Sequence, residues 1–171
     1  MSRRVSLREF QEYLSHRLAG AVTGVNAASL LGVQAGKSRW LMDLSISGEV
    51  ISTLPSLTPV PLTRPSFLGL ANIRGNLHAV TDFPAFIGEE PISLHNSGIR
   101  LLLVGTRFGN NVALLVSGLL GLKKPTDFKV KPPATEKPWN AGLFIDNDGG
   151  KWHRLDLAAL LADPDFMNIV A

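Results

Sequence analysis

The chain has 171 residues, 45% of them hydrophobic and 18% charged, with a net charge of +3 and no cysteine. This composition is typical of a folded globular domain, and it excludes disulfides, zinc–thiolate sites and a cysteine nucleophile. The charge is too small to indicate nucleic-acid binding by itself, and no apolar run is long enough to span a membrane. Residues 1–14 also lack the apolar core of a secretory signal, so we expect a cytoplasmic protein without direct membrane insertion.

An amphipathic helix is predicted over residues 6–19. Ser6 and Glu9 have the spacing of a capping box, and apolar residues recur at helical intervals after them. Gly20 and Gly24 end the pattern, so residues 1–24 form a predicted N-terminal helical extension. Two interpretations remain open for this helix, which either docks on the domain or serves as a partner-binding arm.

Short β-strands separated by turns are predicted next. Residues 29–33 and 40–44 form a predicted hairpin around Gly36-Lys37-Ser38, and residues 46–52 form another strand. The turn resembles the end of a phosphate-binding loop, but a strand follows it where that motif requires a helix. Four prolines then predict an extended crossing segment, because proline interrupts both helices and central strands: Pro55, Pro59, Pro61 and Pro65.

The segment from 67 to 88, FLGLANIRGNLHAVTDFPAFIG, places one arginine between two apolar runs. Gly75-Asn76 is a two-residue turn signal of an antiparallel hairpin. Arg74 is therefore expected at the tip or shoulder of that hairpin, where a rigid scaffold would present it to a partner. Asp82 is interpreted as the cap of a short turn over residues 83–87.

The remaining strands are also predicted as hairpins. Residues 99–104 and 112–116 are almost continuously apolar, so both of their faces should be covered. Residues 118–138 are expected to form a second irregular crossing, and residues 142–145 and 152–155 should pair across a turn at 146–150. Asp156 is expected to cap a short helix that Pro164 stops, and residues 163–171 are expected to form a C-terminal tail.

Together these elements predict a mainly β fold of barrel type. The order of hairpin, extended proline crossing and hairpin appears twice along the chain. Two small, closely packed barrels fit this order better than one large sandwich.

Few residues suggest chemistry. The four histidines, His16, His78, His95 and His153, do not have the spacing of metal ligands, and the sequence after Asp146 lacks the final glutamate of a calcium loop. The lysines between 123 and 137 are interpreted as a solvated loop, with nucleic-acid binding as the alternative. Arg74 either solvates its turn or pairs with Asp82, or else it forms an interface hot spot.

The segment from 67 to 88 resembles the signature of CheW-like domains, the adaptor family of bacterial chemosensory arrays. The matching residues are Gly69, Asn72, Ile73, Arg74, Gly75, Val80, Asp82 and Phe83. The likeness extends over about residues 27 to 161, within a domain placed at 25–162. Residues 61–77, PLTRPSFLGLANIRGNL, look closest to PilI-type adaptors of type IV pilus (twitching motility) systems. Ser117 departs from the family pattern, which usually has aspartate there.

The resemblance implies two intertwined five-stranded SH3-like barrels without catalytic activity or a cofactor. It implies an adaptor that couples chemoreceptor cytoplasmic tips to the regulatory domain of a CheA-type histidine kinase and does not bind nucleic acid. The alternative is a CheW-like structural or regulatory module in another chemosensory or kinase assembly. The expected partner-binding residues are Arg74, Gly75, Asn72, Ile73, Leu68, Leu70, Val50 and Val80.

Overall fold

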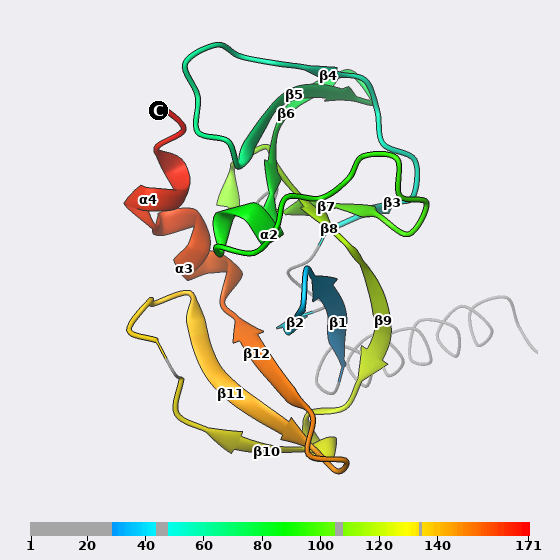
Figure 1. Cartoon of the computed structure of the whole chain (residues 1–171), viewed down its shortest axis with the longest axis vertical. Coiled ribbons are helices and arrows are strands. Elements are labelled where there is room, and N and C mark those ends of the chain that lie inside the picture. The colour runs from blue at the N-terminus through cyan, green and yellow to red at the C-terminus, as the bar shows by residue number, and fades with distance from the viewer. Residues whose placement is uncertain (1–28, 44–47, 105–107, 134) are drawn as a thin grey trace, which may run out of the picture.

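The computed structural model describes residues 29–43, 48–104, 108–133 and 135–171. The predicted N-terminal helix and residues 1–24 lie outside these ranges. The described part is mainly β and consists of two mixed sheets, here named sheet A and sheet B, with a few short helices. Figure 1 shows sheet B above sheet A, with two helices, α3 and α4, along one side.

Sheet A has the strand order β10-β11-β12-β2-β1-β9. All its pairs are antiparallel except β12–β2, which is parallel. The β1–β2 and β11–β12 hairpins confirm two of the predicted pairings. The strands are β1 Leu30–Ala35, β2 Ser38–Asp43, β9 Gly118–Lys123, β10 Phe128–Lys131, β11 Asn140–Asp146 and β12 Lys151–Leu155.

Sheet B has the order β3-β7-β8-β6-β5-β4, with one parallel pair, β6–β8. The β5–β6 and β7–β8 pairs are the predicted antiparallel hairpins. The strands are β3 Val50–Ile51, β4 Leu57–Thr58, β5 Phe67–Ile73, β6 Asn76–Asp82, β7 Arg100–Val104 and β8 Val112–Val116. The short helices are α2 Phe83–Phe86, η2 Pro125–Asp127, α3 Leu157–Ala162 and α4 Pro164–Met167.

The chain builds the two sheets in an intertwined order. It starts sheet A with β1 and β2, forms all of sheet B, and returns to sheet A at β9 (Figure 1). The mainly β fold and its two intertwined parts agree with the predicted fold class. Each sheet has six strands among the described residues, and in sheet B the two edge strands, β3 and β4, have only two residues each.

Apolar side chains form three layers. A central core between the sheets includes Val33 and Trp40 of sheet A and Leu114 of sheet B. Separate clusters fill the other face of each sheet, around Leu115 in sheet B and Leu41 in sheet A. Successive residues of β7 and β8 alternate between the central core and the sheet B cluster. The prediction that both faces of these strands are covered is therefore confirmed.

Two predicted irregular segments contain regular structure. Residues 118–138 include β9 and β10, which pair with β1 and β11. The predicted C-terminal tail contains α4, whose Phe166 is buried, and the last residues pair with the proline crossing through a bridge between Thr63 and Val170. Both differences arise because partners distant in sequence complete the structure.

Candidate functional site

The β5–β6 hairpin turns at Arg74-Gly75. Both residues have positive φ, 52° for Arg74 and 83° for Gly75, as a two-residue hairpin turn of this type requires. The turn is closed by the Asn72 side chain, whose Oδ1 accepts a hydrogen bond from the Gly75 amide at 2.9 Å. The predicted Gly75-Asn76 turn is therefore wrong by one residue, since Asn76 already belongs to β6. Arg74 lies at the tip, as predicted.

The Arg74 guanidinium forms a two-point ion pair with Glu49. Its Nη1 donates to Glu49 Oε2 at 2.6 Å, and its Nη2 donates to Oε1. One of the open alternatives paired Arg74 with Asp82, but that carboxylate is buried and accepts hydrogen bonds from the amides of Ala85 and Ile92. Asp82 thus caps α2, as predicted, and fixes the following loop.

The Arg74–Glu49 ion pair also shows that sheet B is strongly curved. Glu49 immediately precedes β3, and in the sheet order β3 is separated from β6 by β7 and β8. The hairpin tip reaches Glu49 only because the sheet curls. The Arg74 side chain stays 74% exposed, so the pair positions the guanidinium without covering it. Sequence reasoning missed Glu49, because no local pattern links residues 25 positions apart.

The apolar residues of the predicted site divide into core and surface. Val80 and Ile73 are buried in the sheet B cluster, with 0% and 7% exposure, and do not form part of the surface. Leu68 and Leu70 are half-buried, and Leu68 packs against that cluster. Val50 is exposed at the edge strand β3. The expectation of direct partner contact is therefore retained for the exposed and half-buried residues.

Leu77 belongs to this surface, although sequence reasoning did not assign it there. It is 58% exposed and lies opposite Asn72 in the β5–β6 register. The alternation of β6, which buries His78 and Val80, could have indicated that Leu77 faces outward. We use the name hairpin-tip surface for the exposed set Val50, Asn72, Arg74, Gly75 and Leu77. It presents a positioned arginine fork beside two aliphatic side chains and offers hydrogen bonds and apolar contact, but no acid–base pair.

A second polar cluster joins the two sheets. The Ser38 hydroxyl donates to Glu89 Oε1 at 2.5 Å, and the Gly36 amide donates to Ser117 Oγ at 2.9 Å. The hydrogen bond from Ser38, helped by the Lys37 amide and ammonium, holds the pKa of Glu89 below its usual value against the opposing effect of burial. Ser117, where the family pattern usually has aspartate, therefore holds the β1–β2 turn by a hydrogen bond to the Gly36 amide.

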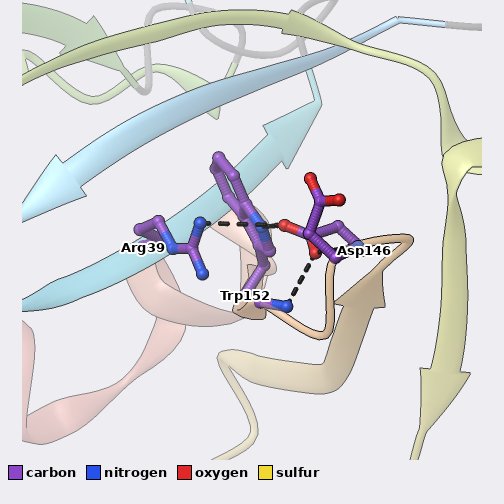
Figure 2. Close-up of polar contacts among 5 residues, drawn as sticks. Arg39, Asp146 and Trp152 are labelled. Carbon is purple, nitrogen blue, oxygen red and sulfur yellow. Dashed lines mark hydrogen bonds and ion pairs between the residues drawn. The ribbon is translucent and has the colours of Figure 1, made fainter.

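The β11–β12 turn has its own half-buried cluster of polar contacts, drawn in Figure 2. Asp146 Oδ2 accepts a hydrogen bond from the Trp152 indole at 2.9 Å and lies 3.7 Å from the Arg39 guanidinium. Asp146 Oδ1 accepts from the amides of Gly150 and Asp148. The indole hydrogen bond is the main cause of a lowered pKa for Asp146. Its oxygens serve the turn itself, in agreement with the interpretation of this segment as a hairpin.

The described residues do not assemble a metal or nucleotide site. No group of three or more potential metal ligands gathers within ranges 29–43, 48–104, 108–133 and 135–171. Gly36-Lys37 forms the β1–β2 turn, not a phosphate loop. Helices able to span a bilayer are likewise lacking from this part of the chain.

Comparison with known proteins identifies the family. The model of the CheW-like domain matches residues 29–165. The chain belongs to the CheW-like domain family. The crystal structure of the scaffolding protein TtCheW from Thermoanaerobacter tengcongensis has the same fold, with a TM-score of 0.64 at 18% identity, covering 76% of this chain and 89% of that one. No curated protein sequence matches the chain significantly.

Membership in the family sets the general function. CheW-like domains are non-enzymatic scaffolds of chemotaxis signalling that couple receptors to the kinase CheA. The chain is accordingly a CheW-like scaffold, and the two-sheet architecture is that of the CheW fold. The sequence-based recognition of the family is confirmed.

Proposed function

We propose that this chain is an adaptor that couples the cytoplasmic tips of methyl-accepting chemoreceptors to the regulatory domain of a CheA-type histidine kinase. In this proposal it is cytoplasmic, recruited to receptor arrays, and part of a type IV pilus (twitching motility) system. The observation that carries the proposal is the exposed arginine fork of Arg74, held by Glu49 at a hairpin tip of a CheW-like domain. Family membership supports the coupling role.

The hairpin-tip surface has the physical properties that such a role needs. Arginine presents several donors in a rigid fork and is enriched among residues that dominate interfaces. The bond to Glu49 fixes the fork before a partner arrives, so less side-chain entropy is lost on binding. The aliphatic neighbours Val50 and Leu77 supply apolar contact beside it. Individual contacts of this size are modest, and an array strengthens them through multivalency.

The pilus assignment rests on sequence likeness in residues 61–77. In the structure this stretch runs from the proline crossing through β5 to the hairpin tip. Leu62 in it is 84% exposed and has a positive φ of 59°. A leucine in that conformation is uncommon and unfavourable. The segment therefore displays an apolar side chain that the fold alone does not require.

Binding of the full chain to a purified receptor tip and kinase regulatory domain tests the coupling role. We expect both to bind and Arg74→Glu, which places two carboxylates together, to weaken binding to at least one of them about tenfold or more, a loss of about 1.4 kcal/mol or more. The exchanged variant Glu49→Arg/Arg74→Glu separates two explanations. If it restores binding, Arg74 acts by holding the hairpin through the ion pair; if it does not, Arg74 contacts the partner. Unchanged binding by Arg74→Glu with retained folding would remove Arg74 from the interface.

The pilus assignment needs a separate measurement. Deletion of the gene should abolish twitching. Complementation with the wild-type gene should restore it, and complementation with the Arg74→Glu variant should restore it only in part. Normal twitching in the deletion strain, together with intact receptor and kinase binding, would place the adaptor in another chemosensory or kinase assembly.

A further inference from the structure

One side of strands β10, β11 and β12 collects positive charge away from the hairpin-tip surface. On the opposite side of these strands, the Phe128 ring contacts the rings of Phe144 and Trp152. Because successive side chains of a strand point to opposite faces, the sequence neighbours of these aromatic residues share the other face. We name that side the basic face, which consists of Lys129, Lys131, Leu143, Ile145 and Lys151, with the half-buried His153 at the end of one row.

The strand register arranges the basic face in two rows. Lys129 lies opposite Ile145, which lies opposite Lys151. In the next row Lys131 lies opposite Leu143, which lies opposite His153, whose ring packs against that of Trp40. Neighbouring strands are about 4.8 Å apart, so the backbones of Lys129 and Lys151 are about 10 Å apart, and Lys129 and Lys131 are separated by about 7 Å along β10. Three cationic side chains thus surround two aliphatic ones.

The three lysines lack ionic partners within the described residues. All three are exposed, and the ion pairs of the described chain involve other residues. The carboxylate of β11, Asp146, lies on the aromatic side, bonded to Trp152. Leu143 and Ile145 are half-exposed between the lysines. The face therefore combines uncompensated positive charge with accessible apolar surface.

Protection of a sheet edge does not account for this pattern. Lysines on edge strands discourage unwanted strand pairing, and β10 is an edge strand of sheet A, so this role explains Lys129 and Lys131. It does not explain Lys151, which lies on β12 inside the sheet, nor the absence of carboxylates from all three strands on this face. Charge complementarity to a bound partner explains all of them.

We infer that the basic face is a docking surface for an acidic amphipathic helix of a partner protein. A helix satisfies its own backbone hydrogen bonds, so it can lie across a sheet face whose strands are already paired. A stripe of leucines would pack on Leu143 and Ile145, and glutamates on both sides of the stripe would pair with the lysines. The face lies on sheet A and the hairpin tip on sheet B, so the two surfaces are built from different strands (Figure 1). The inference does not depend on the identity of the receptor or kinase.

Fluorescence anisotropy with a designed probe tests the inference on the full chain. The probe is a labelled helix of about 18 residues with one leucine stripe flanked by glutamates. One control peptide has lysine in place of every glutamate, and another has serine in place of every leucine. At about 0.15 M salt, where long-range attraction is screened, we expect binding of the probe, and at least tenfold weaker binding of either control peptide.

Matched variants locate the site. Lys129→Glu/Lys131→Glu should weaken probe binding at least tenfold, and Ile145→Thr should weaken it several-fold while preserving the strand. Lys124→Glu/Lys137→Glu changes the same charge outside the face, at the cost of one exposed ion pair between Lys137 and Asp165, and should alter affinity less than twofold. Equal losses in both lysine pairs, or equal binding of the lysine peptide, would overturn the inference. Tighter binding of a single-stranded oligonucleotide, lost in the Lys129/Lys131 variant but insensitive to Ile145→Thr, would assign the face to nucleic acid instead.

Discussion

At the scale of single residues, Gly69 in β5 lies so close to the neighbouring strand that no side chain fits there. Its φ is +125°, and a Cβ at this position would overlap the carbonyl oxygen of Thr58 in the adjacent strand β4. Backbone atoms cannot move aside as a flexible side chain can. We expect Gly69→Ala to lower the free energy of unfolding by about 2–4 kcal/mol, measured by urea denaturation.

Gly75 provides the matched control for this prediction. It also has positive φ, +83°, but a Cβ there meets no atom within 4 Å. Gly75→Ala should therefore cost only about 1–2 kcal/mol, the conformational penalty alone. Equal losses in the two alanine variants would show that conformation, and not the close approach of β4, explains the glycine in the family signature.

At the scale of elements, the junction between β6, α2 and the following loop depends on Asp82. Its carboxylate accepts hydrogen bonds from Ala85 N at 3.0 Å and from Ile92 N at 2.8 Å, and the residue is almost fully buried. Asp82→Ala removes a helix cap and leaves a second amide without its partner. We expect a loss of about 2–4 kcal/mol in unfolding free energy.

Asp156 gives the corresponding exposed cap. It accepts one hydrogen bond, from Ala159 N, at the start of α3. Asp156→Ala should cost only about 1 kcal/mol in the same urea titration. A loss for Asp82→Ala no larger than this would contradict the role assigned to the Ile92 amide.

The elements that could be predicted are those with a local signal. Both apolar strands β7 and β8, the caps Asp82 and Asp156, and the turn before Lys151 follow from patterns within a few residues. Strands β9 and β10 escaped prediction because Gly118, Gly121 and several lysines give them the composition of a loop. They become strands by pairing with β1 and β11. Local propensity is overridden there by tertiary pairing.

The candidate site likewise contains features that the sequence predicts locally and features that depend on the folded sheet. Its location at the Arg74 turn was predictable, since a charged residue beside a turn signal interrupts two apolar runs. Glu49 was not, because curvature of sheet B brings it to Arg74. The burial of Ile73 and Val80 also follows from the whole sheet, since alternation identifies two faces but not which one the core covers.

At the scale of the whole molecule, Glu89 connects the two sheets and should make their association sensitive to acid. Glu89 lies just after α2, the short helix that follows β6 of sheet B. Its carboxylate accepts hydrogen bonds from the Ser38 hydroxyl at the start of β2 in sheet A and from the Lys37 amide in the turn before β2. These hydrogen bonds, above all the one from Ser38, lower the folded-state pKa of Glu89 below its usual value. A carboxylate with a lowered folded pKa stabilises the fold above its unfolded pKa, and this contribution disappears as pH falls through the folded value. The wild type should therefore lose unfolding free energy between about pH 5 and pH 3.

Glu89→Gln keeps the shape of the side chain and removes its titration. We expect this variant to be less stable than the wild type at pH 7 and to show a shallower decline in unfolding free energy between about pH 5 and pH 3, measured by urea titrations at each pH. Glu90→Gln is the neighbouring control, because Glu90 is exposed and its side chain makes no hydrogen bond among the described residues. That variant should retain the wild-type pH dependence. Identical pH profiles for Glu89→Gln and the wild type would show that the contact between the sheets persists without the charge of Glu89, and that Ser117 and the central core hold the sheets together unaided.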